Sequence, residues 1–425
     1  MVVDRVLAVV MAGGMGERLQ PLTRERSKAA VPFAGKSRII DFTLSNCINS
    51  GIRQVYVLTQ YRSESLHRHV QDGWGISSSG LGEFIYCVPA QYKNGADWYR
   101  GTADAVRQNL NLIRERDYDY ILILSGDHIY KMNYLQMLTY HKMKRVDMTV
   151  SAVRVRKEEA VIQLGVLEID KDYKLIGFEE KPAEPRTMPN APDYTMASMG
   201  VYLFSPEVLF KVLKSSGDDF GKDIIPRAIG SGFNALVYDY ENKNAIEDFI
   251  VEVKDGRRQK ILVDRTRDSA YWKDVGTIRS YYEASMDLID IDPLFNLYGE
   301  RWPLRTYHRP LPPSKCVLGG RALDSIISHG CIISGGIVSN SVLSPGVVVE
   351  RDAVVERSIV FDDVIIEPGA RVRRAIIDKG VRVQAGATIG YDLETDRNRG
   401  STISETGIVV IPMGLDIRSS EARLL

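Results

Sequence analysis

Hydrophobic residues in the first 300 positions fall into short apolar runs that alternate with amphipathic segments. Three of these runs have the length and aliphatic content of buried strands: Val6 to Met11, Gln54 to Gln60 and Tyr120 to Ser125. Between the first two, apolar residues at helical spacing predict a helix that ends near Gly51. Strand, helix, strand in this order is typical of a parallel sheet covered by helices. We predict a Rossmann-like α/β domain with a mostly parallel sheet over residues 1–300.

From about residue 317 the apolar residues instead recur at every sixth position. The series has three phases: Ile326, Ile332 and Val338; then Val342, Val348, Val354, Val360, Ile366 and Val372; then Ile377, Val383 and Ile389. A six-residue repeat indicates a parallel β-helix, in which each turn stacks its aliphatic side chains on the next. We predict a left-handed parallel β-helix over residues 317–425, and we interpret the proline- and arginine-rich residues 301–316 as a linker.

Three glycines follow the first predicted strand: Gly13, Gly14 and Gly16. Glycine at a strand exit can adopt a positive φ and leaves the backbone N–H groups free to face an anion. Arg18 and Lys28 add permanent positive charge to the same segment. We interpret this stretch as a loop that binds a polyphosphate; the alternative is an ordinary tight turn.

Two familiar phosphate motifs fit these residues poorly. The dinucleotide-binding pattern Gly-x-Gly-x-x-Gly fails because Leu19 stands in place of its third glycine. A relaxed P-loop match ends at Gly35–Ser37, but it follows no apolar strand and contains Pro32. We therefore favour the glycine loop over either motif.

Polar residues follow the other predicted strands, at the edge where parallel sheets bind their ligands. Gln60 ends the second strand, and Asp127 follows the third. Beside a polyphosphate, Asp127 fits an Mg²⁺ ligand, because that ion prefers one or two carboxylates plus phosphate oxygens. The alternative is that Asp127 caps the next helix. Asp274 is a second isolated aspartate, which would share the ion if it faces Asp127. Lys181 precedes Pro182, which restricts its backbone and suits a lysine that points at one place, where its point charge would hold a phosphate; the alternative is a solvated surface lysine.

Composition adds mainly exclusions. Lys plus Arg and Asp plus Glu both number 55, so no net charge predicts binding to nucleic acid or to an anionic membrane. No apolar run approaches the ~20 residues of a membrane span, and no secretory signal precedes the first strand. The four cysteines are scattered, which fits a reduced cytoplasm and disfavours a disulfide framework or a zinc site. We expect a soluble cytoplasmic protein.

Several longer motifs resemble those of the ADP-glucose pyrophosphorylases (glucose-1-phosphate adenylyltransferases) of bacterial glycogen synthesis. The motifs are AGGMGERL (Ala12–Leu19), RIIDFTLSNCINSGIR (Arg38–Arg53), WYRGTADAV (Trp98–Val106), SGDHIYKMNY (Ser125–Tyr134), EEKP (Glu179–Pro182), ASMGVYLF (Ala197–Phe204), DFGKDIIP (Asp219–Pro226) and WKDVGT (Trp272–Thr277). The resemblance covers nearly the whole chain. Its second and third motifs are the most specific, since related sugar-nucleotide pyrophosphorylases share only the glycine loop and the aspartate positions.

The resemblance implies a reaction and a site. The family transfers the adenylyl group of ATP to glucose 1-phosphate and releases pyrophosphate. By resemblance, Arg18 and Lys28 bind the nucleotide phosphates, Gln60 contacts the adenine, and Asp127 and Asp274 bind Mg²⁺. A further set would hold glucose 1-phosphate: Tyr99, Gly165, Glu180, Lys181 and Ser198. The family is a homotetramer, controlled by sugar-phosphate or carboxylate effectors that bind between the two domains.

Two rival functions stay open from the sequence. Another sugar-1-phosphate nucleotidyltransferase would use the same glycine loop, and a non-catalytic regulatory subunit would bind effectors beside an active partner. An intact set of charged residues argues against the regulatory subunit: Arg18, Lys28, Asp127 and Lys181. Glu25 stands where some relatives place an activator-binding lysine, so the resemblance does not identify the effector.

Overall fold

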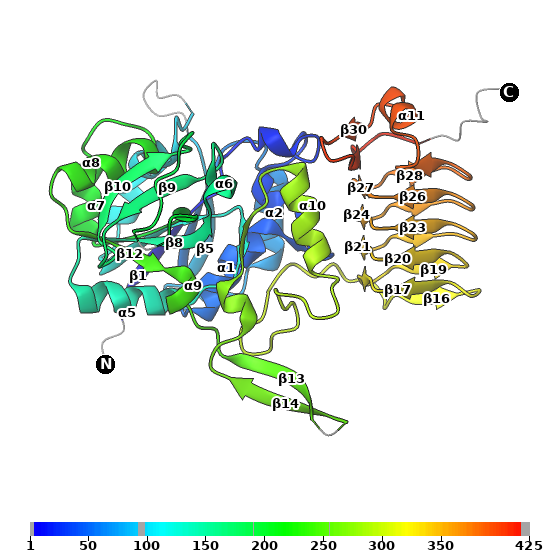
Figure 1. Ribbon diagram of the computed structural model, residues 1–425, viewed down its shortest axis with the longest axis horizontal. Coiled ribbons are helices and arrows are strands. Elements are labelled where there is room, and N and C mark those ends of the chain that lie inside the picture. Colours follow the sequence, from blue (N-terminus) through cyan, green and yellow to red (C-terminus); the bar gives the residue numbers. More distant parts are fainter. Residues whose placement is uncertain (1–3, 92–97, 190, 255, 418–425) are drawn as a thin grey trace.

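The computed structural model describes residues 4–91, 98–189, 191–254 and 256–417. An α/β part runs from β1 (Val6–Met11) to α10 (Ile278–Asp287), and a stack of short strands beginning at β16 (Lys315–Val317) lies beside it (Figure 1). The outermost residues of the two predicted domains, 1–3 and 418–425, lie outside the described residues. Within the described ranges, no helix is long and apolar enough to cross a membrane.

One large sheet forms the centre of the α/β part. Its order is β10-β9-β11-β6-β1-β4-β5, with β8 paired to β11 and β12 paired to β8. These strands are β4 (Gln54–Thr59), β5 (Phe84–Pro89), β6 (Tyr120–Ser125), β8 (Met148–Arg156), β9 (Gly165–Ile169), β10 (Leu175–Glu180), β11 (Tyr194–Phe204) and β12 (Ala235–Asp239). β6, β1, β4 and β5 form a parallel core, and β11 continues it antiparallel to β6. The predicted Rossmann-like domain is confirmed.

Helices pack on both faces of this sheet. Alternate residues of β1 enter two hydrophobic clusters, Leu7 and Val9 in one and Ala8 and Val10 in the other. The first cluster includes α3 (Thr102–Gln108), α4 (Leu110–Arg114), α7 (Pro206–Val212) and α8 (Ile225–Gly230); the second includes α1 (Ile39–Asn49), α2 (Glu64–Gly73) and α5 (Tyr134–Lys144). A strand buried on both faces is what the continuous apolar run predicts.

The carboxyl ends of the parallel core meet at one edge. Met11, at the end of β1, pairs with Ser125 of β6 and with Leu58 of β4. The segments that follow these strands therefore begin side by side, and they carry the glycine loop, Gln60 and Asp127. Beyond the sheet, β13 (Asp248–Lys254) and β14 (Arg257–Val263) form a separate hairpin that projects from the body (Figure 1).

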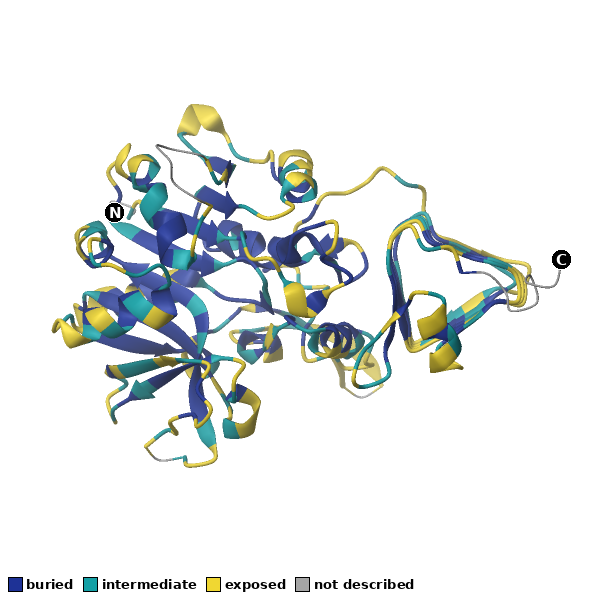
Figure 2. Ribbon diagram, turned by 90° about the horizontal axis from the view of Figure 1, so that it is seen from above, coloured by how far each residue is buried: buried dark blue, intermediate teal, exposed yellow. Residues whose placement is uncertain are grey.

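The second part is a parallel β-helix, as the repeat predicts. Its strands are β16, β17 (Arg321–Leu323), β18 (Ile326–Ile327), β19 (Ile332–Ser334), β20 (Ile337–Ser339), β21 (Val342–Leu343), β22 (Val348–Val349), β23 (Val354–Glu356), β24 (Ile359–Val360), β25 (Ile365–Ile366), β26 (Arg371–Arg373), β27 (Ala375–Ile377), β28 (Arg382–Val383) and β29 (Thr388–Ile389); α11 (Leu393–Asn398), β30 (Thr402–Ile403) and β31 (Val409–Ile411) follow. Seen from above, its coils trace a triangle with buried residues along its sides (Figure 2).

The strict six-residue count was wrong in detail. Ile332 pairs with Val348, sixteen positions on, and Val348 pairs with Ile365, seventeen positions on, so a turn is shorter than three hexapeptides. The count placed Val348 and Val354 inside, but both are only half-buried, whereas Val349 is fully buried. A slip of one residue moves a strand side chain to the opposite face. The repeat length identifies the fold, and the shorter turns decide which residues face inward.

A hydrophobic cluster and a buried ion pair join the two parts. The Tyr281 and Phe361 rings, one from each part, lie 6.4 Å apart between centroids. Arg26 donates two hydrogen bonds to Asp378 of the β-helix, at 3.1 and 2.9 Å, and both side chains are buried. The α/β part and the β-helix therefore share a core.

The segment predicted as a linker has no regular secondary structure from residue 303 to 314. It packs along α1 through side-chain hydrogen bonds. Trp302 donates its indole N–H to Asn46 Oδ1 at 3.0 Å, and Thr306 donates to Asp41 Oδ2 at 2.7 Å. These contacts fix the path between the two parts.

Candidate active site

The positions of the three glycines in the loop after β1 differ in why they require glycine. Gly16 has φ +65°, and a Cβ there would lie 3.0 Å from the Thr23 side chain. A Cβ on Gly13 would lie 3.2 Å from Gln60 Cβ, whereas Gly14 faces open space. The loop therefore needs glycine at position 16 for its backbone conformation and at position 13 for close approach to the end of β4.

Lys28 lies between two carboxylates. Its Nζ is 3.0 Å from Asp127 Oδ2 and 2.7 Å from Asp274 Oδ1, and Arg18 Nη2 lies 3.9 Å from Asp274 Oδ2. A short antiparallel pair brings the two carboxylates together: β7 (His128–Tyr130) and β15 (Trp272–Asp274), with His128 opposite Asp274. Because a strand follows Asp127, the alternative that it caps a helix is wrong.

Electrostatics keeps this cluster ionised. Burial is the largest single influence and would raise the pKa of Asp127 and of Asp274, but Lys28 and His128 together hold both carboxyl pKa values below their usual range. Burial likewise opposes the charge on Lys28, yet the two carboxylates raise the pKa of its ammonium. Ser125 also donates its hydroxyl to Asp127. The site therefore presents two fixed anions that converge on one cation.

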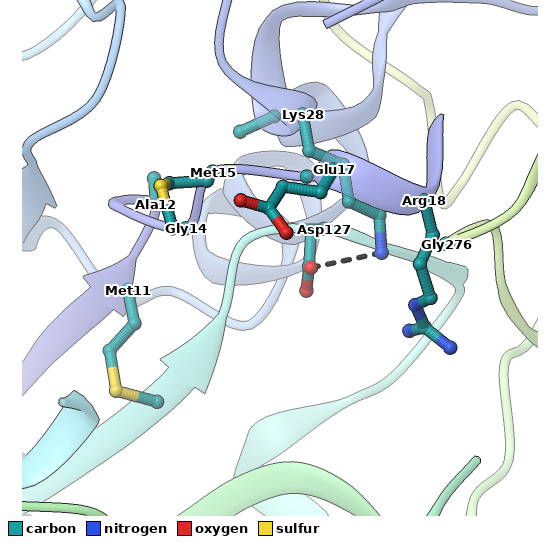
Figure 3. A pocket seen from close by; sticks show the side chains of 11 residues that line it. Met11, Ala12, Gly14, Met15, Glu17, Arg18, Lys28, Asp127 and Gly276 are labelled. Carbon is teal, nitrogen blue, oxygen red and sulfur yellow. Dashed lines mark ion pairs between the residues drawn. The ribbon is translucent and has the colours of Figure 1, made fainter. Parts of the chain in front are cut away.

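Three cavities meet at this cluster. The first, which we call the loop cavity, has a volume of about 430 Å³ and is lined by residues 14–18 with Lys28 and Asp127 (Figure 3). The other two are the Gln60 cavity, of about 330 Å³, and the Lys181 cavity, of about 220 Å³. Asp127 lines all three. Ligand groups that occupy the three cavities would therefore meet beside this carboxylate.

At the Gln60 cavity, the side chain of Gln60 binds the backbone of Tyr99. Gln60 Oε1 accepts a hydrogen bond from the Tyr99 N–H at 2.5 Å, and Gln60 Nε2 donates to the Tyr99 carbonyl at 3.2 Å. Gly13 and Gly14 line the same cavity. Tyr99, which the resemblance grouped with the sugar-phosphate residues, lies here and not among the residues that line the Lys181 cavity.

The Lys181 cavity brings together the other predicted sugar-phosphate residues. They are Gly165, Glu180, Lys181 and Ser198. A Cβ on Gly165 would lie 2.8 Å from Glu180 Oε2, so glycine leaves room for this carboxylate. Burial raises the pKa of Glu180 above its ordinary value. The Lys181 ammonium lies 3.6 Å from Glu180 Oε1 and is about half exposed, so it is free to meet an anion.

The backbone of Lys181 lies outside the region that residues before proline usually adopt. Its φ is +51°, in the left-handed region, although residues before proline favour an extended conformation. Two hydrogen bonds hold this turn: Lys181 N–H donates to the Leu164 carbonyl at 3.2 Å, and Ile162 N–H donates to the Pro182 carbonyl at 3.0 Å. Such strained positions persist where the surroundings fix them, and they cluster at functional sites.

Comparison with known proteins identifies the family of this chain. The model of the family described as "Nucleotidyl transferase" matches residues 7–291, and the "GlmU-like, C-terminal hexapeptide" model matches residues 312–411. Glucose-1-phosphate adenylyltransferases of Rhodopirellula baltica and Thermus thermophilus are both 46% identical to this chain; the alignments cover 98% and 97% of it, and 91% and 99% of the relatives. The chain belongs to the glucose-1-phosphate adenylyltransferase family.

The structure places one further acidic residue, to which the sequence reasoning gave no role, beside these cavities. Asp219 lines both the Gln60 cavity and the Lys181 cavity. Thr102, at the start of α3, donates its hydroxyl to Asp219 Oδ2 at 3.0 Å and accepts from Phe220 N–H at 2.9 Å. Asp219 follows no strand, so the rule that found Asp127 could not find it. Its place in the DFGKDIIP motif was the available signal.

The residues of this family site fit a divalent cation that substrate phosphates help to hold. Within the described ranges, no group of three or more His, Cys, Asp or Glu residues is arranged to bind a metal ion by itself. Asp127 and Asp274 nevertheless converge on one ammonium nitrogen. Two carboxylates completed by phosphate oxygens and water are the usual Mg²⁺ environment in phosphate-handling enzymes.

Proposed function

We propose that this chain transfers the adenylyl group of ATP to α-D-glucose 1-phosphate, giving ADP-glucose and pyrophosphate for glycogen synthesis. The observation that carries the proposal is the junction of the three cavities at Asp127, with at least one cationic side chain lining each of them. A nucleotide and a sugar phosphate together have three groups to place: the base, the phosphates that leave, and the sugar. Each of the three cavities would hold one of these groups. The names of the relatives supply the identities of the two substrates.

The reaction needs no general base. A phosphate oxygen of glucose 1-phosphate, already an anion, forms a bond to the α-phosphorus of ATP as the bond from that phosphorus to the β-phosphate oxygen breaks. Catalysis of this step is mainly alignment and neutralisation of charge. In our proposal Arg18 and Lys28 neutralise the leaving pyrophosphate, and the glycine loop supplies its N–H groups to the phosphates.

The remaining residues select and hold the substrates. Gln60, with Gly13 and Gly14, borders the space for the adenine nucleotide. The residues proposed for glucose 1-phosphate are Gly165, Glu180, Lys181 and Ser198. Lys181 holds the sugar phosphate against the repulsion of the triphosphate.

We assign Asp127 and Asp274 to a divalent cation, and we propose Mg²⁺. When bound, the ion would supply positive charge to the reacting phosphates. The low pKa values of both carboxyls keep them anionic and ready to bind it.

We also propose that residues 1–300 carry catalysis and that the β-helix, residues 317–425, joined through residues 301–316, carries regulation and assembly into a homotetramer. A cavity of about 100 Å³ between the two parts supports an anionic effector, such as a sugar phosphate or a carboxylate. Its basic lining residues are Lys36, Arg38, Arg309 and Lys379, with one carboxylate, Asp362. We expect a cytoplasmic enzyme, because the four cysteines are free thiols in the described chain.

The test is pyrophosphate release by the purified chain from ATP and glucose 1-phosphate, with and without a panel of sugar phosphates. We expect activity with ATP that exceeds activity with UTP, GTP or dTTP. Preference for another nucleotide would identify a different sugar nucleotidyltransferase. No activity from the chain alone, with activity restored by a second subunit, would identify a regulatory subunit.

A further inference from the structure

His128 lines the Lys181 cavity, although the proposed function gives this residue no role. It follows Asp127 directly in the chain and lies opposite Asp274 in the pairing of β7 with β15. Its side chain is only 14% exposed, and its ring stands edge-on to the Trp272 ring, with 5.0 Å between the centroids. Packing therefore holds the imidazole in one orientation.

The two nitrogens of this imidazole meet different groups. Nδ1 lies 3.2 Å from the Met199 carbonyl oxygen, whereas Nε2 lies 3.6 Å from Asp127 Oδ1 and 4.0 Å from Asp274 Oδ1. A carbonyl oxygen only accepts hydrogen bonds, so Nδ1 carries a hydrogen and donates it to Met199. Both Nε2 distances exceed those of a hydrogen bond. The hydrogen bond of the His128 ring therefore connects β7 with β11.

Met199 lies in a bulge of β11. The register of β11 on β8 shifts after Ser198, and Met199 and Gly200 are the extra residues of the bulge. Gly200 has φ +65°, and a Cβ there would lie 3.1 Å from Ser125 Cβ. Bulges next to active sites turn a side chain in a new direction. Here that side chain is Ser198, which lines the Lys181 cavity and whose Oγ accepts a hydrogen bond from Gly200 N–H at 3.2 Å.

We propose that His128 is a positioning residue of the adenylyl transfer: by holding the Met199 carbonyl, it fixes the bulge that places Ser198 in the sugar-phosphate space. This inference rests on the proposed function, in which Ser198 holds glucose 1-phosphate. Because His128 adjoins Asp127 in the chain, its hydrogen bond ties the sugar half of the site to the carboxylate where the two substrates meet. Alignment of two bound substrates depends on such ties.

The test compares three substitutions of His128 by the KM values for glucose 1-phosphate and for ATP, from pyrophosphate release by the full-length chain. His128→Phe keeps a ring without a donor; it should raise the KM for glucose 1-phosphate about fivefold or more, as for the loss of one hydrogen bond, and leave the KM for ATP unchanged. His128→Asn places an amide N–H near the position of Nδ1 and should preserve both KM values. His128→Gln places its amide near the position of Nε2 and should behave like His128→Phe.

His141→Phe is the matched control. His141 is also a buried histidine, with its Nδ1 2.8 Å from Thr149 Oγ1, and it lines none of the three cavities. Its replacement should change neither KM value. A rise in the KM for glucose 1-phosphate that matches that of His128→Phe would show a general effect of losing a buried histidine and would refute the inference.

The other outcomes separate this inference from the proposed function. An unchanged KM for glucose 1-phosphate in His128→Phe, or an equal rise of both KM values, refutes the positioning role while the adenylyltransferase function stands. Preservation by glutamine alone, by both amides or by neither also refutes it, because the hydrogen bond to Met199 would not be the cause. If His128→Phe does not fold, the asparagine and glutamine variants decide by the same criterion. If the unmodified chain does not transfer the adenylyl group to glucose 1-phosphate, the proposed function and this inference fall together.

Discussion

Asp127 and Asp274 offer the sharpest test of the site, because both lie against the same nitrogen. Their carboxylate oxygens are 3.0 and 2.7 Å from Lys28 Nζ. If they share one cation, removing either carboxylate loses the same interaction. We expect Asp127→Asn and Asp274→Asn each to lower kcat by about a thousandfold, equivalent to about 4 kcal/mol of transition-state stabilisation. The double variant should lose about the same amount, so the coupling energy is also about 4 kcal/mol.

The assay is steady-state pyrophosphate release at saturating ATP and glucose 1-phosphate. Asp119→Asn serves as the control, since this exposed carboxylate pairs with Arg5 away from the site and its loss should not change kcat. Losses that multiply to about a millionfold in the double variant would show two independent roles and refute the shared cation. Near-normal activity of Asp127→Asn would remove that residue from the mechanism.

Three further predictions follow from single contacts. Lys181→Ala should raise the KM for glucose 1-phosphate about tenfold or more, as for loss of a charged hydrogen bond, and an effect confined to the KM for ATP would contradict its assignment. Asp378→Asn leaves Arg26 buried without a carboxylate and should cost about 3–5 kcal/mol of unfolding free energy in urea titrations. The control is Asp363→Asn, which removes a more exposed ion pair with Arg309 at 2.7 Å and should cost less than about 1 kcal/mol; equal losses would refute the buried coupling. Burial raises the pKa of Glu180, so as pH falls from 7 this carboxylate takes up a proton before an ordinary glutamate would, and the KM for glucose 1-phosphate should rise. Glu180→Gln should abolish this pH dependence of the KM. If the variant keeps the same pH profile, Glu180 is not its source.

The periodicity of the chain predicted the local elements well. β1 and β6 have the predicted bounds, and β4 ends one residue before Gln60. A few consecutive apolar residues are enough to predict a buried parallel strand, and the polar residue that follows it lies at the edge of the sheet where ligands bind. This logic found the glycine loop, Gln60 and Asp127. The repeat after residue 317 identified the β-helix in the same way.

The sequence did not show which distant segments contact one another. Lys28 meets Asp274 across 246 positions, only because β7 and β15 pair, and an isolated aspartate in the sequence carries no sign of its partner. The left-handed turn at Lys181 and the inward choice of Val349 over Val348 are further cases. The period of the hydrophobic residues depends only on residues that are close in sequence, so it can be read directly from the sequence. Convergence of charges depends on strand pairing and turn geometry across the whole fold, and those are settled only when the tertiary structure forms.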